Sequence, residues 1–174
     1  MISLASRLLV ILGSALQHDA WKEFTGSARF TVTYPAAWRR IGISTDRLDI
    51  LSSAEFAEGV LIAQNEAEII VIELPDSAGA SFGELIERET QGDSVVSHRE
   101  VRGTIANNQG CKTLRELVAT SEVAPGVHEI DTVFYCEVHG RKFATRLRNW
   151  PHDRRQAEYR RIALRVARSL RVPG

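Results

Sequence analysis

The pattern of apolar and polar side chains in the first half of the chain predicts several strands. Residues 28–34 read ARFTVTY, an alternating stretch rich in β-branched and aromatic side chains that Pro35 ends. Residues 68–74 read EIIVIEL, a nearly continuous apolar run typical of a strand buried on both faces. Short strands are also expected at 47–51 and 60–63.

The second half predicts an antiparallel meander. Its strands are expected at 95–106, 111–120, 127–138 and 141–148. The breaks between them are rich in Asn, Pro and Gly, and the pair His139-Gly140 is typical of a tight hairpin. The meander and the earlier strands together indicate one antiparallel sheet.

Two helices complete the pattern. The first is predicted over 81–90, where Ser81 can cap the helix and Glu84 stands at the capping-box position. For the C-terminal helix, Asp153 is expected to be the cap with Gln156 at the matching spacing. This helix carries an apolar stripe at helical spacing, made of Tyr159, Ile162, Ala163, Val166, Ala167 and Leu170. The predicted fold class is therefore α+β, an antiparallel sheet with helices packed on it.

The opposite face of the C-terminal helix is basic. It carries Arg154, Arg161, Arg165 and Arg168, together with Glu158. Two interpretations remain at this point. The face is either an ordinary solvated helix surface or a docking surface for an anionic partner, which is a protein, a lipid headgroup or, least favoured, a nucleic acid.

The total charge hides an uneven distribution. The chain has 22 basic and 22 acidic residues, which gives a formal net charge of zero. Residues 139–174 carry 11 of the basic residues and only two acidic ones, so this segment is near +9 and the rest of the chain near −9. Such asymmetry is typical of a surface that interacts with a partner.

The first 15 residues, MISLASRLLVILGSA, have the layout of a secretory signal peptide. Their apolar run is too short to span a membrane. We expect residues 1–20 to be a signal peptide or, alternatively, a retained hydrophobic anchor helix, and residues 21–174 to form a single domain. Export predicts an extracytoplasmic location, in a periplasm or lumen, with peripheral membrane contact if the segment is retained.

Two cysteines, Cys111 and Cys136, suit a single disulfide in an exported domain. They are placed symmetrically about a midpoint between Val123 and Ala124, which predicts that they face each other across a hairpin. A pair of buried free thiols is the alternative.

No motif of a known catalytic class is present, so no catalytic residue, metal or cofactor is predicted. Glu66, Glu68, Glu73 and Asp76 form an acidic cluster that could hold Ca²⁺ or Mn²⁺, but solvated strand ends are the favoured interpretation. The aromatic residues Tyr34, Trp38 and Trp150 are expected to close the ends of the sheet.

Three features resemble the PsbP-like family, which includes a photosystem II extrinsic protein and the Ran-binding Mog proteins. They are the strand that ends in Tyr34-Pro35-x-x-Trp38, the order of strands, middle helix, meander and terminal helix, and the ending in which Tyr159 and Ile162 precede Ser169-Leu170-Arg171-Val172. The resemblance covers roughly residues 24–173. It implies an α/β/α sandwich used as a non-catalytic binding or assembly module, and it carries over no ligand motif.

The favoured hypothesis is an exported, non-catalytic accessory subunit of a larger, membrane-associated protein complex, with no nucleic-acid partner. The alternative is a domain that binds a small molecule, a lipid or a metal in a pocket between sheet and helix. An enzyme with a Cys or His centre assembled through space is the least favoured.

Overall fold

The computed structural model describes residues 20–27, 30–41, 45, 47–52, 66–74, 79–91, 93–101, 111 and 113–173. Residues 1–19 of the predicted leader and the strand predicted at 60–63 lie outside these ranges. So do residues 102–106 of the strand predicted at 95–106, the whole predicted break at 107–110 and residue Asp76 of the acidic cluster.

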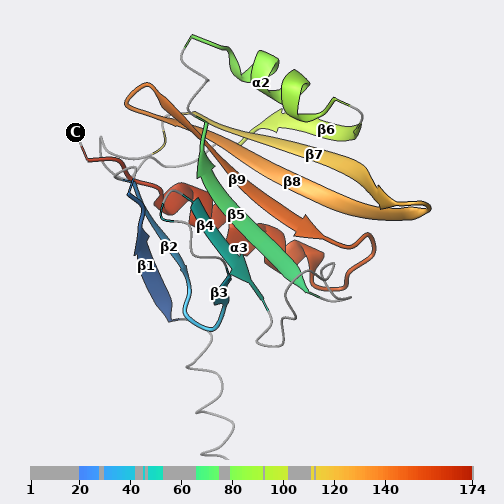
Figure 1. Ribbon diagram of the computed structural model, residues 1–174, viewed down its shortest axis with the longest axis horizontal. Helices are drawn as coiled ribbons and strands as arrows, with labels where there is room; N and C mark the ends of the chain where they lie inside the picture. The colour runs from blue at the N-terminus through green and yellow to red at the C-terminus, as the bar shows by residue number, and fades with distance from the viewer. Residues whose placement is uncertain are drawn as a thin grey trace, which may run out of the picture.

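A seven-stranded antiparallel sheet forms the centre of the molecule (Figure 1). The meander is confirmed, because its four strands are neighbours in chain order and β5 joins it at β9. From one edge to the other the order is β3 (Arg39–Ile41), β4 (Arg47–Leu51), β5 (Ala67–Glu73), β9 (Arg141–Asn149), β8 (Val127–Val138), β7 (Thr113–Ala124) and β6 (Ser94–Glu100).

A separate two-stranded hairpin precedes the sheet. Strand β1 (Trp21–Thr25) pairs with β2 (Thr31–Pro35). Strand β1 was not predicted, because its two large apolar side chains, Trp21 and Phe24, are three positions apart and give no two-residue period. Strand β3 was missed for a similar reason, since its residues Arg39, Arg40 and Ile41 are mostly polar and exposed.

The two helices lie on opposite faces of the sheet (Figure 1). Helix α2 (Phe82–Glu89) packs through Phe82, Leu85 and Ile86 on one face, and helix α3 (Gln156–Ser169) covers the other together with the hairpin. The predicted α+β fold, with an antiparallel sheet between helical layers, is therefore confirmed.

The capping box of α2 is confirmed, whereas the predicted cap of α3 was wrong. The Ser81 N–H donates to Glu84 Oε2 at 2.6 Å and the Glu84 N–H donates to Ser81 Oγ at 3.2 Å. Helix α3 begins at Gln156 after Arg155, which makes no side-chain cap. Asp153 Oδ1 instead accepts a hydrogen bond from the Arg155 N–H at 2.7 Å, within the turn before the helix.

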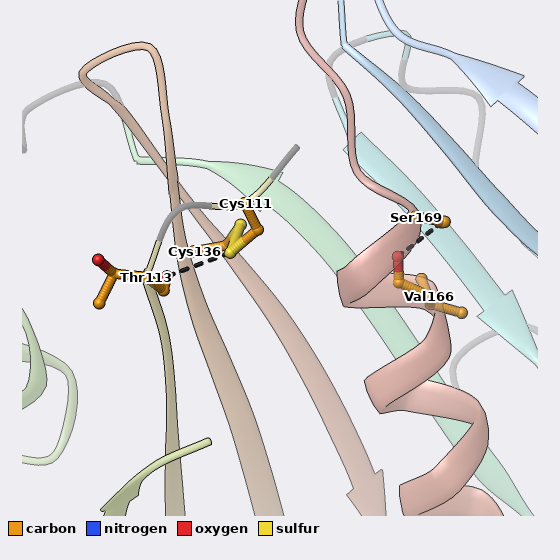
Figure 2. Close-up of a disulfide and its surroundings, with 5 residues drawn as sticks. All are labelled: Cys111, Thr113, Cys136, Val166 and Ser169. Carbon is orange, nitrogen blue, oxygen red and sulfur yellow. Dashed lines mark hydrogen bonds between the residues drawn. A yellow bond between two sulfur atoms is a disulfide. The ribbon is translucent and has the colours of Figure 1, made fainter. Parts of the chain in front are cut away.

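The end of α3 fastens the hairpin to the rest of the fold. The Ser169 hydroxyl donates to the Val166 carbonyl at 2.7 Å (Figure 2) and accepts from the Thr33 N–H at 2.8 Å. Thr31 and Arg171 then exchange two backbone hydrogen bonds of 2.9 Å each. These bonds join β2 to the end of α3, and the Trp21 ring of β1 contacts Arg165 of the same helix.

Cys111 and Cys136 come together, but the predicted register was wrong. Leu114, and not Cys111, lies directly opposite Cys136 in the β7–β8 ladder, because the turn is at Pro125-Gly126 and a bulge follows Glu122. Cys111 lies just before β7 and reaches Cys136 from there, with an S–S distance of 2.21 Å and a Cα–Cα distance of 5.5 Å (Figure 2). The two sulfurs are thus at disulfide distance.

Candidate partner-binding site

Helix α3 has one buried apolar face and one exposed basic face, as its sequence predicts. Tyr159, Ala163, Val166 and Ala167 are buried against the sheet and the hairpin. The four predicted partner-binding residues are all exposed: Arg161, Arg165 and Arg168 lie on the outer side of the helix, whereas Arg154 lies in the turn before it. We call this set the arginine ridge: Arg154, Arg161, Arg165 and Arg168.

The ridge contacts aromatic and backbone groups. The guanidinium of Arg165 lies 4.0 Å from the centre of the Trp21 ring, a cation–π contact. Arg161 Nε lies 3.4 Å from the Ala157 carbonyl of its own helix. Within the described ranges, no carboxylate forms an ion pair with Arg154, Arg161 or Arg165, so their charges face solvent without a paired anion.

Other arginines of the same basic segment are paired across the sheet. Arg148 on β9 lies between its direct cross-strand partners Glu68 on β5 and Asp131 on β8. Its closest contacts are to Glu129 Oε2 at 2.6 Å and Glu68 Oε2 at 3.0 Å, and Asp131 Oδ1 lies 4.0 Å away. Glu129 is only 1% exposed, so Arg148 neutralises a carboxylate that water scarcely reaches.

Burial is the largest influence on the pKa of two of these carboxyls, Glu68 and Asp131. It raises the pKa of Glu68 above its ordinary value, although Arg148 opposes the shift. Burial likewise raises the pKa of Asp131, against the attraction of Arg146 and Arg148. At both carboxyls, burial therefore outweighs the attraction of the neighbouring arginines.

A second paired site links α3 to β7. Burial alone would raise the pKa of Glu116, but hydrogen bonds from Arg160 and Arg99 outweigh it and hold the pKa below its ordinary value. The Arg160 Nη2 to Glu116 Oε2 distance is 2.7 Å, and Arg99 Nε lies 2.6 Å from the same oxygen. On β9, Arg141 pairs with Glu73 at 2.6 Å. Much of the charge separation along the chain is therefore complementary pairing inside the fold.

A cavity of about 430 Å³ lies between the hairpin and the first turns of α3. The hairpin and the turn after it contribute Trp21, Pro35, Ala37 and Trp38, and the loop after β4 contributes Ser52. The opposite wall consists of Arg155, just before α3, and of Glu158 and Ile162 on the helix. The sequence pointed to Trp38 only as a residue that closes the sheet, and nothing in it marked Trp21, because the cavity depends on how the hairpin packs against the helix.

Trp38 is buried and meets Tyr159 edge-on, with 5.9 Å between the ring centres. Tyr34 is also buried in this core, and Trp150 is partly exposed. Trp38 thus packs against helix α3, so its role extends beyond the end of the sheet.

The described members of the acidic cluster do not converge. Glu68 and Glu73 are five residues apart on β5, so they point to opposite faces of the sheet, and each pairs with an arginine. Among the described residues, no group of three or more His, Cys, Asp or Glu side chains is arranged to hold a metal ion. Over the same residues, no helix has the length and apolar character needed to cross a membrane.

The geometry defines an α+β protein with an antiparallel sheet between α2 and α3. No protein-family model matches the chain, and no curated protein sequence matches it either. Solved structures do show the fold. A Bacteroides thetaiotaomicron protein is 12% identical over 88% of this chain and 48% of its own, with a TM-score of 0.50.

Similar structures also include the two kinds of protein to which the resemblance in sequence pointed. The Ran-binding protein Mog1p of Saccharomyces cerevisiae is 10% identical over 88% of this chain and 95% of its own, with a TM-score of 0.47. Cyanobacterial PsbP of Synechocystis is 13% identical over 88% and 93%, with a TM-score of 0.47. At these identities the likeness concerns the arrangement of helices and strands.

Proposed function

We propose that this chain is a non-catalytic accessory subunit that binds a larger protein assembly through the outer face of α3. The observation that carries the proposal is the arginine ridge. Other arginines of the same segment, such as Arg148 and Arg160, are paired within the fold, whereas Arg161 and Arg165 project to solvent without a described carboxylate. Unneutralised guanidinium groups on one helix face favour an anionic protein surface.

The proposal includes export and association with a membrane-bound complex. The apolar leader pattern of residues 1–15 supports export, and so does the cysteine pair at disulfide distance. In this proposal, Cys111 and Cys136 form a disulfide in an oxidising compartment. Replacing both by serine should lower the free energy of unfolding of the oxidised protein by about 3 kcal/mol. The double variant and the reduced wild type should then unfold at the same urea concentration.

The proposed role is tested on protein isolated from cells that express it at its natural level. Solubilised membranes should yield the chain in a complex much larger than 19.4 kDa, which high salt dissociates because the contact is electrostatic. N-terminal sequencing of the same material should show cleavage before the domain. Recovery only as a free, soluble monomer would contradict the proposal.

A further inference from the structure

The side chain of Trp21 connects the cavity beside α3 to the arginine ridge. Its ring lines the cavity and also carries the guanidinium of Arg165 at 4.0 Å. On α3, Glu158 and Ile162 line the cavity, and Arg161 and Arg165 follow them three positions later, which makes each pair neighbours on the helix surface. The two features are therefore parts of one continuous surface, and a ligand that enters the cavity would also meet the ridge.

The apolar walls of the cavity are held in place by the fold. Trp38 is 7% exposed and is fixed edge-on against the buried Tyr159 ring. Trp21 pairs with Pro35 in the hairpin ladder, and the Ala36 N–H donates to the Ala20 carbonyl at 2.8 Å. A preformed pocket loses little conformational entropy when an apolar side chain enters it.

The charges on this surface select the ligand. Glu158 lies on the cavity wall, where Arg155 pairs with it at 3.0 Å, so a carboxylate inside the cavity would face a like charge. Just outside, Arg161 and Arg165 offer cations without a described carboxylate. The surface therefore suits an uncharged apolar side chain in the cavity and acidic groups beside it.

The spacing also fits a peptide. A helix rises about 1.5 Å per residue, so the four positions from Glu158 to Ile162 span roughly 6 Å and the three from Ile162 to Arg165 about 5 Å. An extended peptide advances about 3.3 Å per residue, so a carboxylate one to three residues from the apolar side chain can reach the ridge.

We propose that the cavity and the ridge together bind an acidic peptide segment of a partner protein, which inserts one apolar side chain between Trp38 and Ile162 and places carboxylates on Arg161 and Arg165. This inference rests on the proposed function, because it names the partner class for the same face of α3. It adds a pocket and a sequence requirement that the ridge alone does not impose.

The test uses the full-length protein and three blocked synthetic peptides. The first has a single leucine flanked by acidic residues, the second has serine in place of leucine, and the third has amides in place of all carboxylates. Fluorescence of the cavity tryptophans reports binding. The leucine peptide should bind about tenfold or more tightly than either of the others, since a buried leucine and a paired carboxylate each add affinity.

Variants locate the binding. Ala37→Phe should fill the cavity from an exposed position and weaken the leucine peptide about tenfold, whereas Ala37→Ser should leave its affinity unchanged. The double substitution Arg161→Glu and Arg165→Glu should weaken the same peptide at least tenfold. Arg88→Glu on α2, exposed on the opposite side of the sheet, is the matched charge control and should have little effect.

Each contrary outcome overturns the inference in a distinct way. Equal affinity for the leucine and serine peptides, or no effect of Ala37→Phe, would show that the cavity does not take part. Loss of the native complex on ridge reversal with no peptide binding would leave the proposed function standing and remove the pocket. Binding to anionic vesicles that Ala37→Phe does not change, with no peptide binding, would assign the ridge to a membrane surface.

Discussion

Arg148 and Arg165 belong to the same basic segment, yet the fold uses them differently. Arg148 lies on the sheet among Glu68, Glu129 and Asp131, and its positive charge is paired with these carboxylates. Arg165 lies on the outer face of α3, on the Trp21 ring, with no described carboxylate paired to it. The comparison shows that a cluster of cations in a sequence does not define a basic surface, because pairing across strands decides which charges reach solvent.

Removing the partly buried cation, Arg148, should have the largest effect on stability. Arg148→Met should lower the free energy of unfolding by about 3–5 kcal/mol, because it leaves Glu129 buried without a counter-charge. Urea denaturation measures the loss. The matched change on the ridge, Arg161→Met, should stay within about 0.5 kcal/mol of wild type. Equal losses in the two variants would erase the distinction between the two regions.

The Arg160–Glu116 contact should have an intermediate effect that depends on pH. Arg160→Met should cost about 2 kcal/mol at neutral pH, because Glu116 then keeps Arg99 alone. The pKa of Glu116 is lowered in the folded state, so its contribution is present above 4.5, the ordinary glutamate value, and is lost as the pH falls through the folded pKa. Glu116→Gln should accordingly flatten the acid side of the stability profile. If the free energy of unfolding of Glu116→Gln fell with decreasing pH as steeply as that of the wild type, this role of Glu116 would be contradicted.

A smaller effect of opposite sign is expected at Asp131. Its folded pKa is raised above the ordinary 3.8, so the free energy of unfolding falls as the pH rises from 3.8 to the folded pKa and stays lower above it. Asp131→Asn should therefore raise the melting temperature at pH 7 by a few degrees at most. The gain should vanish below pH 3.8, where the wild-type carboxyl is protonated in both states. A destabilised variant at neutral pH would show that the Arg148 attraction outweighs burial.

Added salt should distinguish the arginine ridge from the Arg148 cluster, with only a small change in the free energy of unfolding. Raising the ionic strength from 0.1 M to 1 M shortens the Debye length from about 10 Å to about 3 Å, which screens the exposed ridge far more than the partly buried Arg148 cluster. Partner binding should weaken strongly, while the urea midpoint, measured in parallel, should move little. If salt lowered partner binding and the urea midpoint to the same degree, the charges that bind the partner and those that stabilise the fold would be equally exposed, which would contradict the comparison.

Sequence periodicity was sufficient for the elements with a clear hydrophobic pattern. Strand β8 was predicted at its observed bounds, Val127–Val138, and the Ser81–Glu84 capping box was predicted correctly. The His139-Gly140 hairpin also formed, with φ of 50° and 78°. In each of these cases the determining residues are neighbours in sequence, so local propensity and period contain the information.

Features that depend on tertiary packing could not be predicted. The turn at Pro125-Gly126 sets the β7–β8 register and the bulge after Glu122 adjusts it by one residue, so Leu114 and not Cys111 lies opposite Cys136. The Arg148 cluster joins residues from β5, β8 and β9, and its formation depends on β5 lying beside β9. The cavity beside Trp21 likewise lies between the hairpin and α3, two elements that the Thr33–Ser169 contact joins across 136 positions of the chain.

One variant tests the central claim most directly. Arg161→Glu, Arg165→Glu and Arg168→Glu together should abolish recovery of the native complex while the free energy of unfolding stays within about 1 kcal/mol of wild type. The matching triple change to lysine, which keeps the charge, should retain most of the complex. A folded triple-glutamate variant that still forms the wild-type complex would contradict the assignment of α3 as the partner-binding face.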